Sequence, residues 1–192
     1  MYRVLSSIVR HLPFSAAALS ATSCTMATTT SNAAASGESV VFAGGCFWCV
    51  EAPYSALKGI HTVESGYIGG HVKNPSYRDV CSGETGHAEA VKITYDPGVV
   101  SYDLLMDVFF TLHDPTQLNR QGNDVGTQYR SAIFYSTDEQ EKATQAKIKE
   151  LEKKLPSAIE TTVEPLSKWI WYPAEEYHQV SDDTANRILL PA

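Results

Sequence analysis

The segment Gly44-Gly45-Cys46-Phe47-Trp48-Cys49 most constrains the fold, because it joins an expected strand to an expected helix within a few residues. Residues 40–43 are apolar and mostly β-branched or aromatic, which predicts a buried strand. Residues 50–57 suit a helix, and Lys58-Gly59 is typical of a helix end. Cys46 should therefore lie where a strand passes through two glycines into a helix N-terminus.

This position favours a reactive thiol at Cys46. Free backbone N–H groups and the positive end of the helix dipole stabilise an anion there. A thiolate is such an anion, so we expect a lowered pKa for Cys46. The alternative is a small apolar core residue packed beside two aromatic side chains.

The overall composition excludes several classes of function. The chain has 192 residues, of which 43% are hydrophobic, enough to form one globular domain with a sizeable core. Its net charge of −7 argues against nonspecific binding to nucleic acid. No apolar run reaches the length of a membrane-spanning helix. Four cysteines are too few for a disulfide scaffold in a chain of this length, so a chemical role is favoured.

Residues 1–37 differ in composition from the rest of the chain. They contain Arg3 and Arg10 but no Asp or Glu, and they are rich in Ser, Ala and Thr, as in an organelle transit peptide. A secretory signal and a plain disordered tail are the alternatives. We expect a mitochondrial or other organellar location, or a cytoplasmic one if translation starts at Met26. The folded domain is then expected over residues 38–192.

The remaining pattern predicts an α+β domain with two layers and a sheet covered mainly on one face, because one expected strand pair lacks a helix between its strands. A helix over 103–113 should place Leu104, Leu105, Val108, Phe109 and Leu112 on one side. The other expected elements are strands over 61–67, 88–95, 129–135 and 161–166, a helix from Thr137 to 155, a short final helix over 174–179, and long loops over 71–86 and 114–128.

Glu89 is the main candidate for acid chemistry. It lies in an alternating strand, and a buried carboxyl has a raised pKa, which suits a general acid. A surface carboxylate on an edge strand is the equally weighted alternative. Three further residues are candidates for the site: Asp124, His87 and Tyr129. Asp124 could instead be a turn residue, His87 a capping side chain and Tyr129 an ordinary strand tyrosine.

Taken together, these stretches resemble the methionine sulfoxide reductase A family. The resemblance rests on separated motifs in the right order: Gly44 to Trp48, Gly66 to Gly70, Asn74 to Tyr77, Val80 to Val91, Asn123 to Ser131 and Ala174 to Gln179. Because they span nearly all of 38–179, the match is far more specific than a single Cys-x-x-Cys.

The resemblance implies the two-layer α+β fold of the family, with a mixed β-sheet. It implies reduction of the S epimer of methionine sulfoxide, free or in proteins, and so the repair of proteins under oxidative stress. By position, the nucleophile is Cys46, the groups around the sulfoxide oxygen are Glu89, Tyr77 and Tyr129, and Asp124 supports them. Phe47 and Trp48 form the apolar wall for the substrate methyl group, and Gly45 and His87 are the further expected substrate-binding residues.

The chemistry implied for these residues has two stages. The Cys46 thiolate attacks the sulfoxide sulfur while Glu89 protonates the oxygen, which leaves a sulfenic acid on Cys46. A second thiol then condenses with it to a disulfide. We expect no bound cofactor and no metal. The reducing equivalents should come from thioredoxin, with glutaredoxin or glutathione as the alternative, and the protein should be a monomer.

The source of the second thiol departs from many family members, because no cysteine follows Cys81. Cys49 is the favoured resolving residue, since it lies one helical turn beyond Cys46. Cys81 and an external thiol remain alternatives. Pro53 is expected to kink the following helix or to limit its first part.

Two rival functions remain at this point. The Cys46-x-x-Cys49 pattern after a strand also occurs in thioredoxin-like oxidoreductases, but that class leaves Glu89 and Tyr77 without a role. A zinc-binding module using Cys46, Cys49, Cys81 and His87 is much less favoured, because the ligand spacing is irregular.

Overall fold

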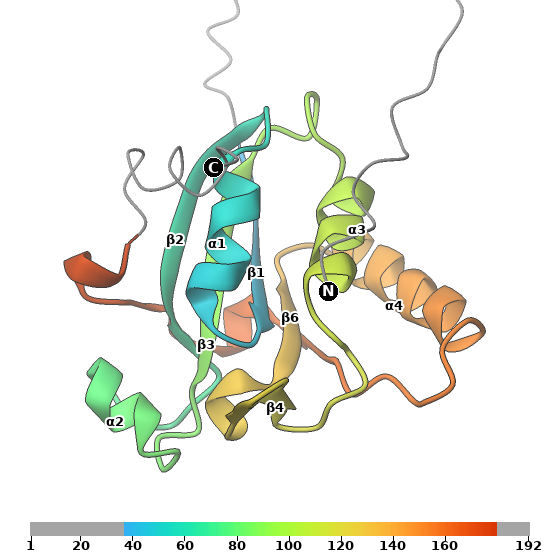
Figure 1. Cartoon of the computed structure of the whole chain (residues 1–192). Helices are drawn as coiled ribbons and strands as arrows, with labels where there is room; N and C mark the ends of the chain where they lie inside the picture. The colour runs from blue at the N-terminus through green and yellow to red at the C-terminus, as the bar shows by residue number, and fades with distance from the viewer. Residues whose placement is uncertain (1–36, 180–192) are drawn as a thin grey trace, which may run out of the picture. The chain divides into compact units, whose positions relative to one another are not determined.

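The computed structural model describes residues 37–179. The expected leader therefore lies almost entirely outside the described residues. The described part contains a six-stranded sheet in the order β7-β6-β1-β3-β2-β8 (Figure 1). Its strands are β1 (Glu38–Gly44), β2 (Ile60–Ile68), β3 (Ala88–Tyr95), β6 (Ser131–Tyr135), β7 (Thr162–Pro165) and β8 (Tyr172–Pro173). Neighbouring strands are antiparallel except β6 and β7, so the sheet is mixed, as expected.

The centre of the sheet is formed by β1 and β3. Val40 to Ala43 are fully buried, which confirms the predicted buried strand. Phe42 is paired with Val91 of β3 on one side and with Ile133 of β6 on the other. This places the end of β1, and therefore the start of the Cys46 turn, in the middle of the sheet.

Two helices cover one face of the sheet (Figure 1): α1 (Phe47–Ser55) and α3 (Tyr102–Leu112). Their apolar side chains pack with the sheet residues Phe42, Val91 and Ile133 in the larger core cluster. The longest helix, α4 (Asp138–Glu152), begins at Thr137, whose hydroxyl caps the N–H of Gln140. This arrangement confirms the α+β class.

The opposite face carries small residues and is covered by a returning chain segment. Ala43, Ala88, Ala90 and Ala132 lie on it with Val41, Ile68 and Phe134. Leu166, Trp169 and Trp171, which follow β7, pack against these residues. Small alanines allow this non-helical segment, which includes η2 (Leu166–Lys168), to approach the strands closely.

Several local expectations require correction. The expected loop over 71–86 contains α2 (Tyr77–Cys81), which begins with a capping box between Ser76 and Asp79. The final segment forms the 3₁₀ turn η3 (Glu176–His178) rather than an α-helix. The second loop contains a small hairpin of β4 (Arg120–Gln121) and β5 (Asp124–Val125), followed by η1 (Thr127–Tyr129).

The expected apolar side of α3 is also partly wrong. Leu105 and Phe109 are fully buried, but so is Met106, whereas Leu104 and Leu112 are exposed by 45% and 37%. The helix is therefore rotated relative to the expected stripe, and Met106 is buried in place of Leu104.

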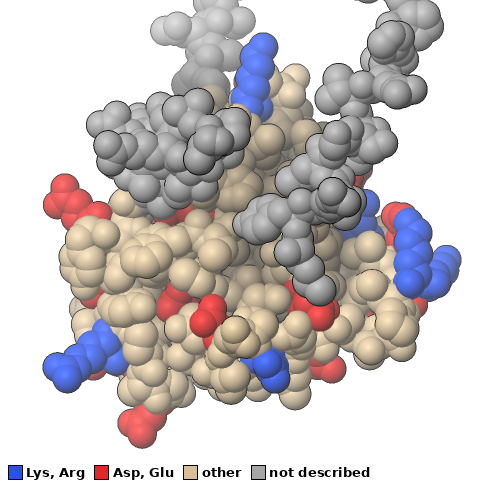
Figure 2. Space-filling model, in the orientation of Figure 1, with Lys and Arg blue, Asp and Glu red and all other residues tan. Residues whose placement is uncertain are grey.

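The described surface shows no strong segregation of charge on the face seen in Figure 2. Lys and Arg side chains there are dispersed among Asp and Glu, and uncharged residues occupy much of the visible area. Between residues 37 and 179, no helix combines the length and hydropathy needed to cross a membrane.

Candidate active site

The double glycine makes a tight turn beneath the hairpin of β4 and β5. Gly45 has a φ of +99°, in the left-handed region that favours glycine. A Cβ atom on Gly45 would lie 2.9 Å from the side chain of Gln121. Both features require glycine, and they let the chain pass directly from β1 to α1. Gly45 is thus a turn residue in the structure, and a contact between Gly45 and substrate stays a prediction.

Cys46 is the N-cap residue of α1, with φ −58° and ψ 125°. The helix begins at Phe47, three residues earlier than expected, and Pro53 lies inside it, as in the expected helix. Cys46 is half-buried, and its carbonyl accepts the N–H of Cys49 at 3.1 Å. The predicted position at a helix N-terminus is therefore confirmed.

The expected lowering of the Cys46 pKa is wrong. The pKa of this thiol is raised to about 11, mainly by burial and also by the charges of Glu89 and Cys49. The backbone N–H groups of Trp48 and Cys49 act in the opposite direction, as expected at a helix N-terminus, but they are outweighed. In the free protein at neutral pH, Cys46 is thus a thiol.

Glu89 lies in β3, a central strand, where it is paired with Tyr67 of β2. Its side chain is only 1% exposed, so the alternative of an edge-strand surface carboxylate is wrong. The N–H of Phe47 donates to Glu89 Oε2 at 3.3 Å, while Oε1 is buried without a hydrogen-bond partner. The pKa of Glu89 is raised to about 7, mainly by burial and also by the charge of Asp124, against the lowering effect of the Phe47 N–H.

Tyr77, Tyr129 and Asp124 interact electrostatically with Glu89. Tyr129, at the end of η1, has a pKa raised to about 12, first by burial and then by the charge of Glu89. Tyr77, the first residue of α2, also has a raised pKa, first through a hydrogen bond with Cys81 and then through burial, with Glu89 among the further causes. Both phenols are therefore neutral at physiological pH, and both lie within the electrostatic influence of Glu89.

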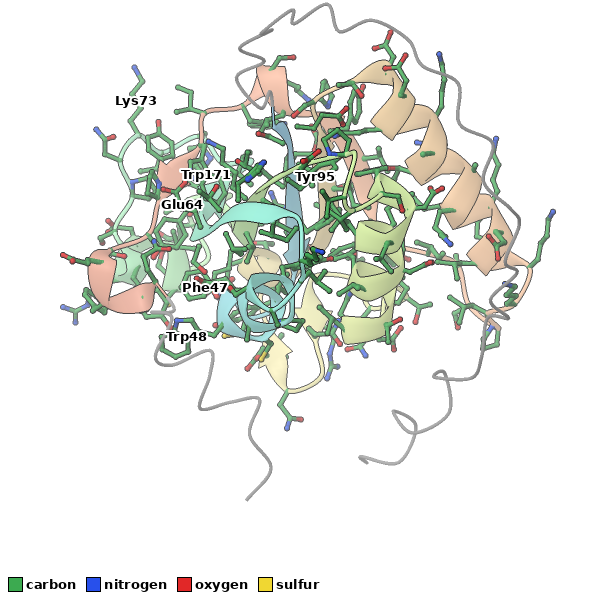
Figure 3. All side chains as sticks on the ribbon, turned by 90° about the horizontal axis from the view of Figure 1, so that it is seen from above. Phe47, Trp48, Glu64, Lys73, Tyr95 and Trp171 are labelled. Atoms are coloured by element: carbon green, nitrogen blue, oxygen red, sulfur yellow. The ribbon has the colours of Figure 1, made fainter. Side chains whose placement is uncertain are left out.

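Aromatic side chains form one wall of the site. Phe47 is buried, while Trp48 is 48% exposed, and their ring centroids are 6.0 Å apart. Both project from the start of α1 toward the C-terminal segment that carries η3 (Figure 3). The ring of His178 in η3 packs against Phe47 at 5.3 Å and against Tyr77 at 4.3 Å. The wall is thus built from α1, α2 and η3 together.

The sequence matches a known protein family. The sequence model of the family described as "Peptide methionine sulfoxide reductase" matches residues 38–186. The chain belongs to this family. The "Peptide methionine sulfoxide reductase MsrA" of Pasteurella multocida is 54% identical over 142 residues, which cover 74% of this chain and 80% of that protein. The chain is an enzyme of the family's reductase type.

Solved structures of this family share the fold. The reduced form of Mxr1 from Saccharomyces cerevisiae is 35% identical and superposes with a TM-score of 0.70, covering 81% of this chain and 88% of that one. Mxr1 in complex with Trx2 is 26% identical in its aligned part and superposes with a TM-score of 0.54, covering 80% and 92%. The two-layer α+β architecture is therefore that of the reductase family.

His87, which was expected to bind substrate, instead forms hydrogen bonds with the backbone through both ring nitrogens. The N–H of Gly70 donates to His87 Nδ1 at 3.2 Å, and His87 Nε2 donates to the carbonyl of Val72 at 2.8 Å. Burial lowers the pKa of His87, so the ring is neutral and both nitrogens are used by the backbone. His87 thus fastens the loop that follows β2 and has no ring nitrogen left for a substrate.

The three described cysteines are all free thiols. Cys49 is exposed on the first turn of α1, and Cys81 is exposed at the end of α2. Cys49 is among the charges that raise the Cys46 pKa, whereas Cys81 contacts Tyr77. In residues 37–179, no group of three or more His, Cys, Asp or Glu side chains is arranged to hold a metal ion.

Glu175, His178 and Gln179 had no individually expected role, although the motif from Ala174 to Gln179 contributed to the family resemblance. In the structure, Glu175 accepts the N–H of Tyr77, and His178 accepts the indole N–H of Trp48. Tyr77 and Trp48 are two of the expected site residues. The hydrogen bonds of Tyr77 and Trp48 with this distant segment could not be predicted from the sequence, because they depend on how the chain folds.

Proposed function

We propose that the protein reduces methionine-S-sulfoxide, free or within proteins, to methionine through a sulfenic acid on Cys46. The observation that carries this proposal is the buried carboxyl of Glu89, with one oxygen unpartnered, beside a half-buried thiol. A buried polar atom without a partner is costly unless a ligand uses it. A sulfoxide oxygen is a suitable partner for the buried Glu89 carboxyl, because it accepts a hydrogen bond and then a proton from the acid.

The first stage moves the oxygen from the substrate sulfur to Cys46. The sulfur of Cys46 attacks the sulfoxide sulfur and forms an S–S bond, while a proton from Glu89 converts the sulfoxide oxygen to a hydroxyl group. This hydroxyl group then moves to the sulfur of Cys46: the S–O bond of the substrate and the S–S bond break, the S–O bond of Cys–S–OH forms, and methionine leaves. Tyr77 and Tyr129 donate hydrogen bonds to the oxygen as its negative charge develops. Asp124 acts through its charge, which helps keep the proton on Glu89.

The pKa values of Cys46 and Glu89 place the proton of the free site on sulfur. Because Cys46 titrates at about 11 and Glu89 at about 7, the singly protonated pair carries its proton mainly on sulfur. Transfer of this proton to Glu89 is uphill in the free site, and it creates the thiolate and the acid in a single step that the bound sulfoxide must draw forward. The thiolate thus forms next to the substrate oxygen that needs the proton.

The second stage regenerates the enzyme. The thiol of Cys49 attacks the sulfur of Cys46, water leaves, and a Cys46–Cys49 disulfide forms. Support comes from the N-cap position of Cys46 and from the electrostatic influence of Cys49 on it. A thioredoxin then reduces the disulfide and is itself oxidised, in line with the yeast relative that was crystallised with Trx2. Cys81 and a small thiol such as glutathione are the alternatives that mapping of the disulfide distinguishes.

The test is methionine release from each sulfoxide epimer, measured with free and with peptide-bound substrate. We expect release from the S epimer in both forms and at least tenfold less from the R epimer. Equal rates for the two epimers would contradict the assignment. Reduction of insulin disulfides without methionine release would instead support a thioredoxin-like dithiol oxidoreductase.

We further propose that residues 1–37 direct the enzyme to mitochondria or another organelle, where it repairs oxidised proteins as a monomer. The support is compositional: this segment has arginines but no acidic residues. A fluorescent protein fused after residue 37 should enter the organelle, whereas the fusion that starts at Met26 should stay in the cytoplasm. Equal distribution of the two fusions would contradict the targeting role.

A further inference from the structure

The C-terminal segment from Ala174 to Gln179 is fastened to the sheet without being a strand. Gln179 accepts the N–H of Ser65 at 2.9 Å and donates to the carbonyl of Ser65 at 2.9 Å, so its amide occupies the place of a strand backbone. The N–H of Ala174 donates to the same carbonyl, also at 2.9 Å. Both ends of the segment are therefore fixed to one residue of β2.

Between these two ends, Glu175 reaches the substrate site. Its Oε1 accepts the backbone N–H of Tyr77 at 2.8 Å, and its Oε2 accepts the hydroxyl of Tyr67 at 2.9 Å. Tyr67 is fully buried, packs against Phe47, and is the β2 partner of Glu89. One carboxylate therefore joins the first residue of α2 to the strand beside the acid.

The same segment also holds the aromatic wall. The indole N–H of Trp48 donates to the carbonyl of His178 at 2.7 Å, and the His178 ring packs 5.5 Å from the Trp48 ring. Both ring nitrogens of His178 are buried without a hydrogen-bond partner. A buried polar group without a partner works against the packed state. The His178 side chain therefore adds no hydrogen bond to the attachment of the segment, whereas the side chains of Glu175 and Gln179 do.

We infer that Glu175 is a positioning residue, which holds Tyr77 over the substrate oxygen and, through the segment ending in His178, holds Trp48 against the substrate methyl group. This inference rests on the proposed sulfoxide reduction, in which Tyr77 and Trp48 contact the substrate. A charged carboxylate suits the task, because its hydrogen bonds with the N–H and the hydroxyl are stronger than those of a neutral group. No residue of the segment needs to touch the substrate itself.

The test compares Glu175→Ala and Glu175→Gln with Glu176→Ala. Glu176 is the adjacent carboxylate, and it is exposed, so it controls for loss of charge in the segment. Three quantities are measured in the full-length protein: methionine formed in a single turnover at saturating S-sulfoxide, alkylation of Cys46 by iodoacetamide, and exchange of the Tyr77 amide and Trp48 indole hydrogens by NMR. Alkylation does not use Tyr77 or Trp48, so it reports general damage to the Cys46 turn.

In Glu175→Ala, we expect methionine formation to slow roughly 10–100-fold, the effect of a misplaced catalytic contact. Exchange at Tyr77 and Trp48 should accelerate, while alkylation should stay within twofold of wild type. Glu175→Gln should recover part of the rate, because its amide oxygen can still accept the Tyr77 N–H. Glu176→Ala should match the wild type in all three measurements.

Two outcomes would overturn the inference: a Glu175→Ala rate within twofold of Glu176→Ala, or equal losses in methionine formation and alkylation. Wild-type protein that releases no methionine would overturn the proposed function instead. In that case the exchange of the Tyr77 and Trp48 hydrogens still reports whether Glu175 holds them.

Discussion

At the scale of single residues, the central feature is a thiol and a carboxyl whose pKa values are both raised. Cys46 is at the end of a helix whose N–H groups favour the thiolate, yet burial and the charge of Glu89 outweigh them. The spacing of residues in the sequence indicated the helix N-terminus. It did not indicate how deeply Cys46 is buried, which depends on β3 and on the hairpin of β4 and β5. The thiol is therefore activated by its acid partner and the substrate, and not in advance by the helix.

Replacing Glu89 by Gln should slow the chemical step by roughly 10²–10⁴-fold, because Gln keeps the shape of the side chain but is a far weaker acid. The measurement is methionine formed in a single turnover, with thioredoxin absent. Substrate affinity should change little. An unchanged single-turnover rate would mean that the proton comes from another group.

The reactivity of Cys46 should depend on pH in a defined direction. Because its pKa is about 11, alkylation by iodoacetamide should increase about tenfold per pH unit from pH 8 to pH 10. Glu89 is negatively charged above about pH 7 and raises the thiol pKa, so Glu89→Gln should be alkylated faster than wild type at pH 9. Alkylation that levels off below pH 8 would show a lowered thiol pKa instead. Mass spectrometry after digestion separates Cys46 from Cys49 and Cys81.

At the scale of elements, α1 begins directly after Cys46 and carries Cys49 together with Phe47 and Trp48 of the aromatic wall. The motif in the sequence predicted this strand–turn–helix unit, because glycines, an N-terminal cysteine and flanking apolar residues are local signals. Its helical turn over Phe47 to Cys49 was not predicted, because the expected helix covered only residues 50–57. The Ser76–Asp79 capping box of α2 was present in the sequence but was hidden by the surrounding Gly, Pro and Asn residues.

Cys49→Ser should leave the first turnover intact and block continued turnover with thioredoxin, because it removes only the thiol that condenses with the sulfenic acid. Steady-state methionine formation and peptide mapping of the oxidised wild type are the measurements. We expect a Cys46–Cys49 link in the wild type. Cys81→Ser, at the other exposed thiol, is the matched control and should continue to turn over. A Cys46–Cys81 link would reject the Cys49 route, and a glutathione adduct on Cys46 would point to an external thiol.

The burial pattern of α3 gives a stability prediction with a control on the same helix. Phe109 is fully buried, and its ring stacks 4.7 Å from that of Phe42. Phe109→Ala should lower the free energy of unfolding by about 3–5 kcal/mol through lost burial and a cavity. Leu104→Ala, at an exposed site, should change it by at most about 0.5 kcal/mol. Urea unfolding measures both, and equal effects would contradict the observed orientation of α3.

At the scale of the whole molecule, the site is assembled from segments that are distant along the chain. The sequence predicted the α+β class and the positions of the main strands along the chain, because these follow from local patterns. It could not predict that Tyr67 is paired with Glu89, or that Glu175 is bonded to Tyr77, because strand register and long-range hydrogen bonds are set by packing. The grouping of Cys46, Glu89, Tyr77 and Tyr129 came from the family resemblance and not from their spacing.

The most direct test of the account is a single turnover without any added reductant. Reduced protein is mixed with excess methionine-S-sulfoxide, and methionine and the mass of each cysteine-containing peptide are measured. Wild type should form about one equivalent of methionine and become oxidised at Cys46, whereas Cys46→Ser should form none, because serine is not an available nucleophile at neutral pH and cannot form a sulfenic acid. Methionine formation by Cys46→Ser, or oxidation of the wild type that spares Cys46, would contradict the central role of this thiol.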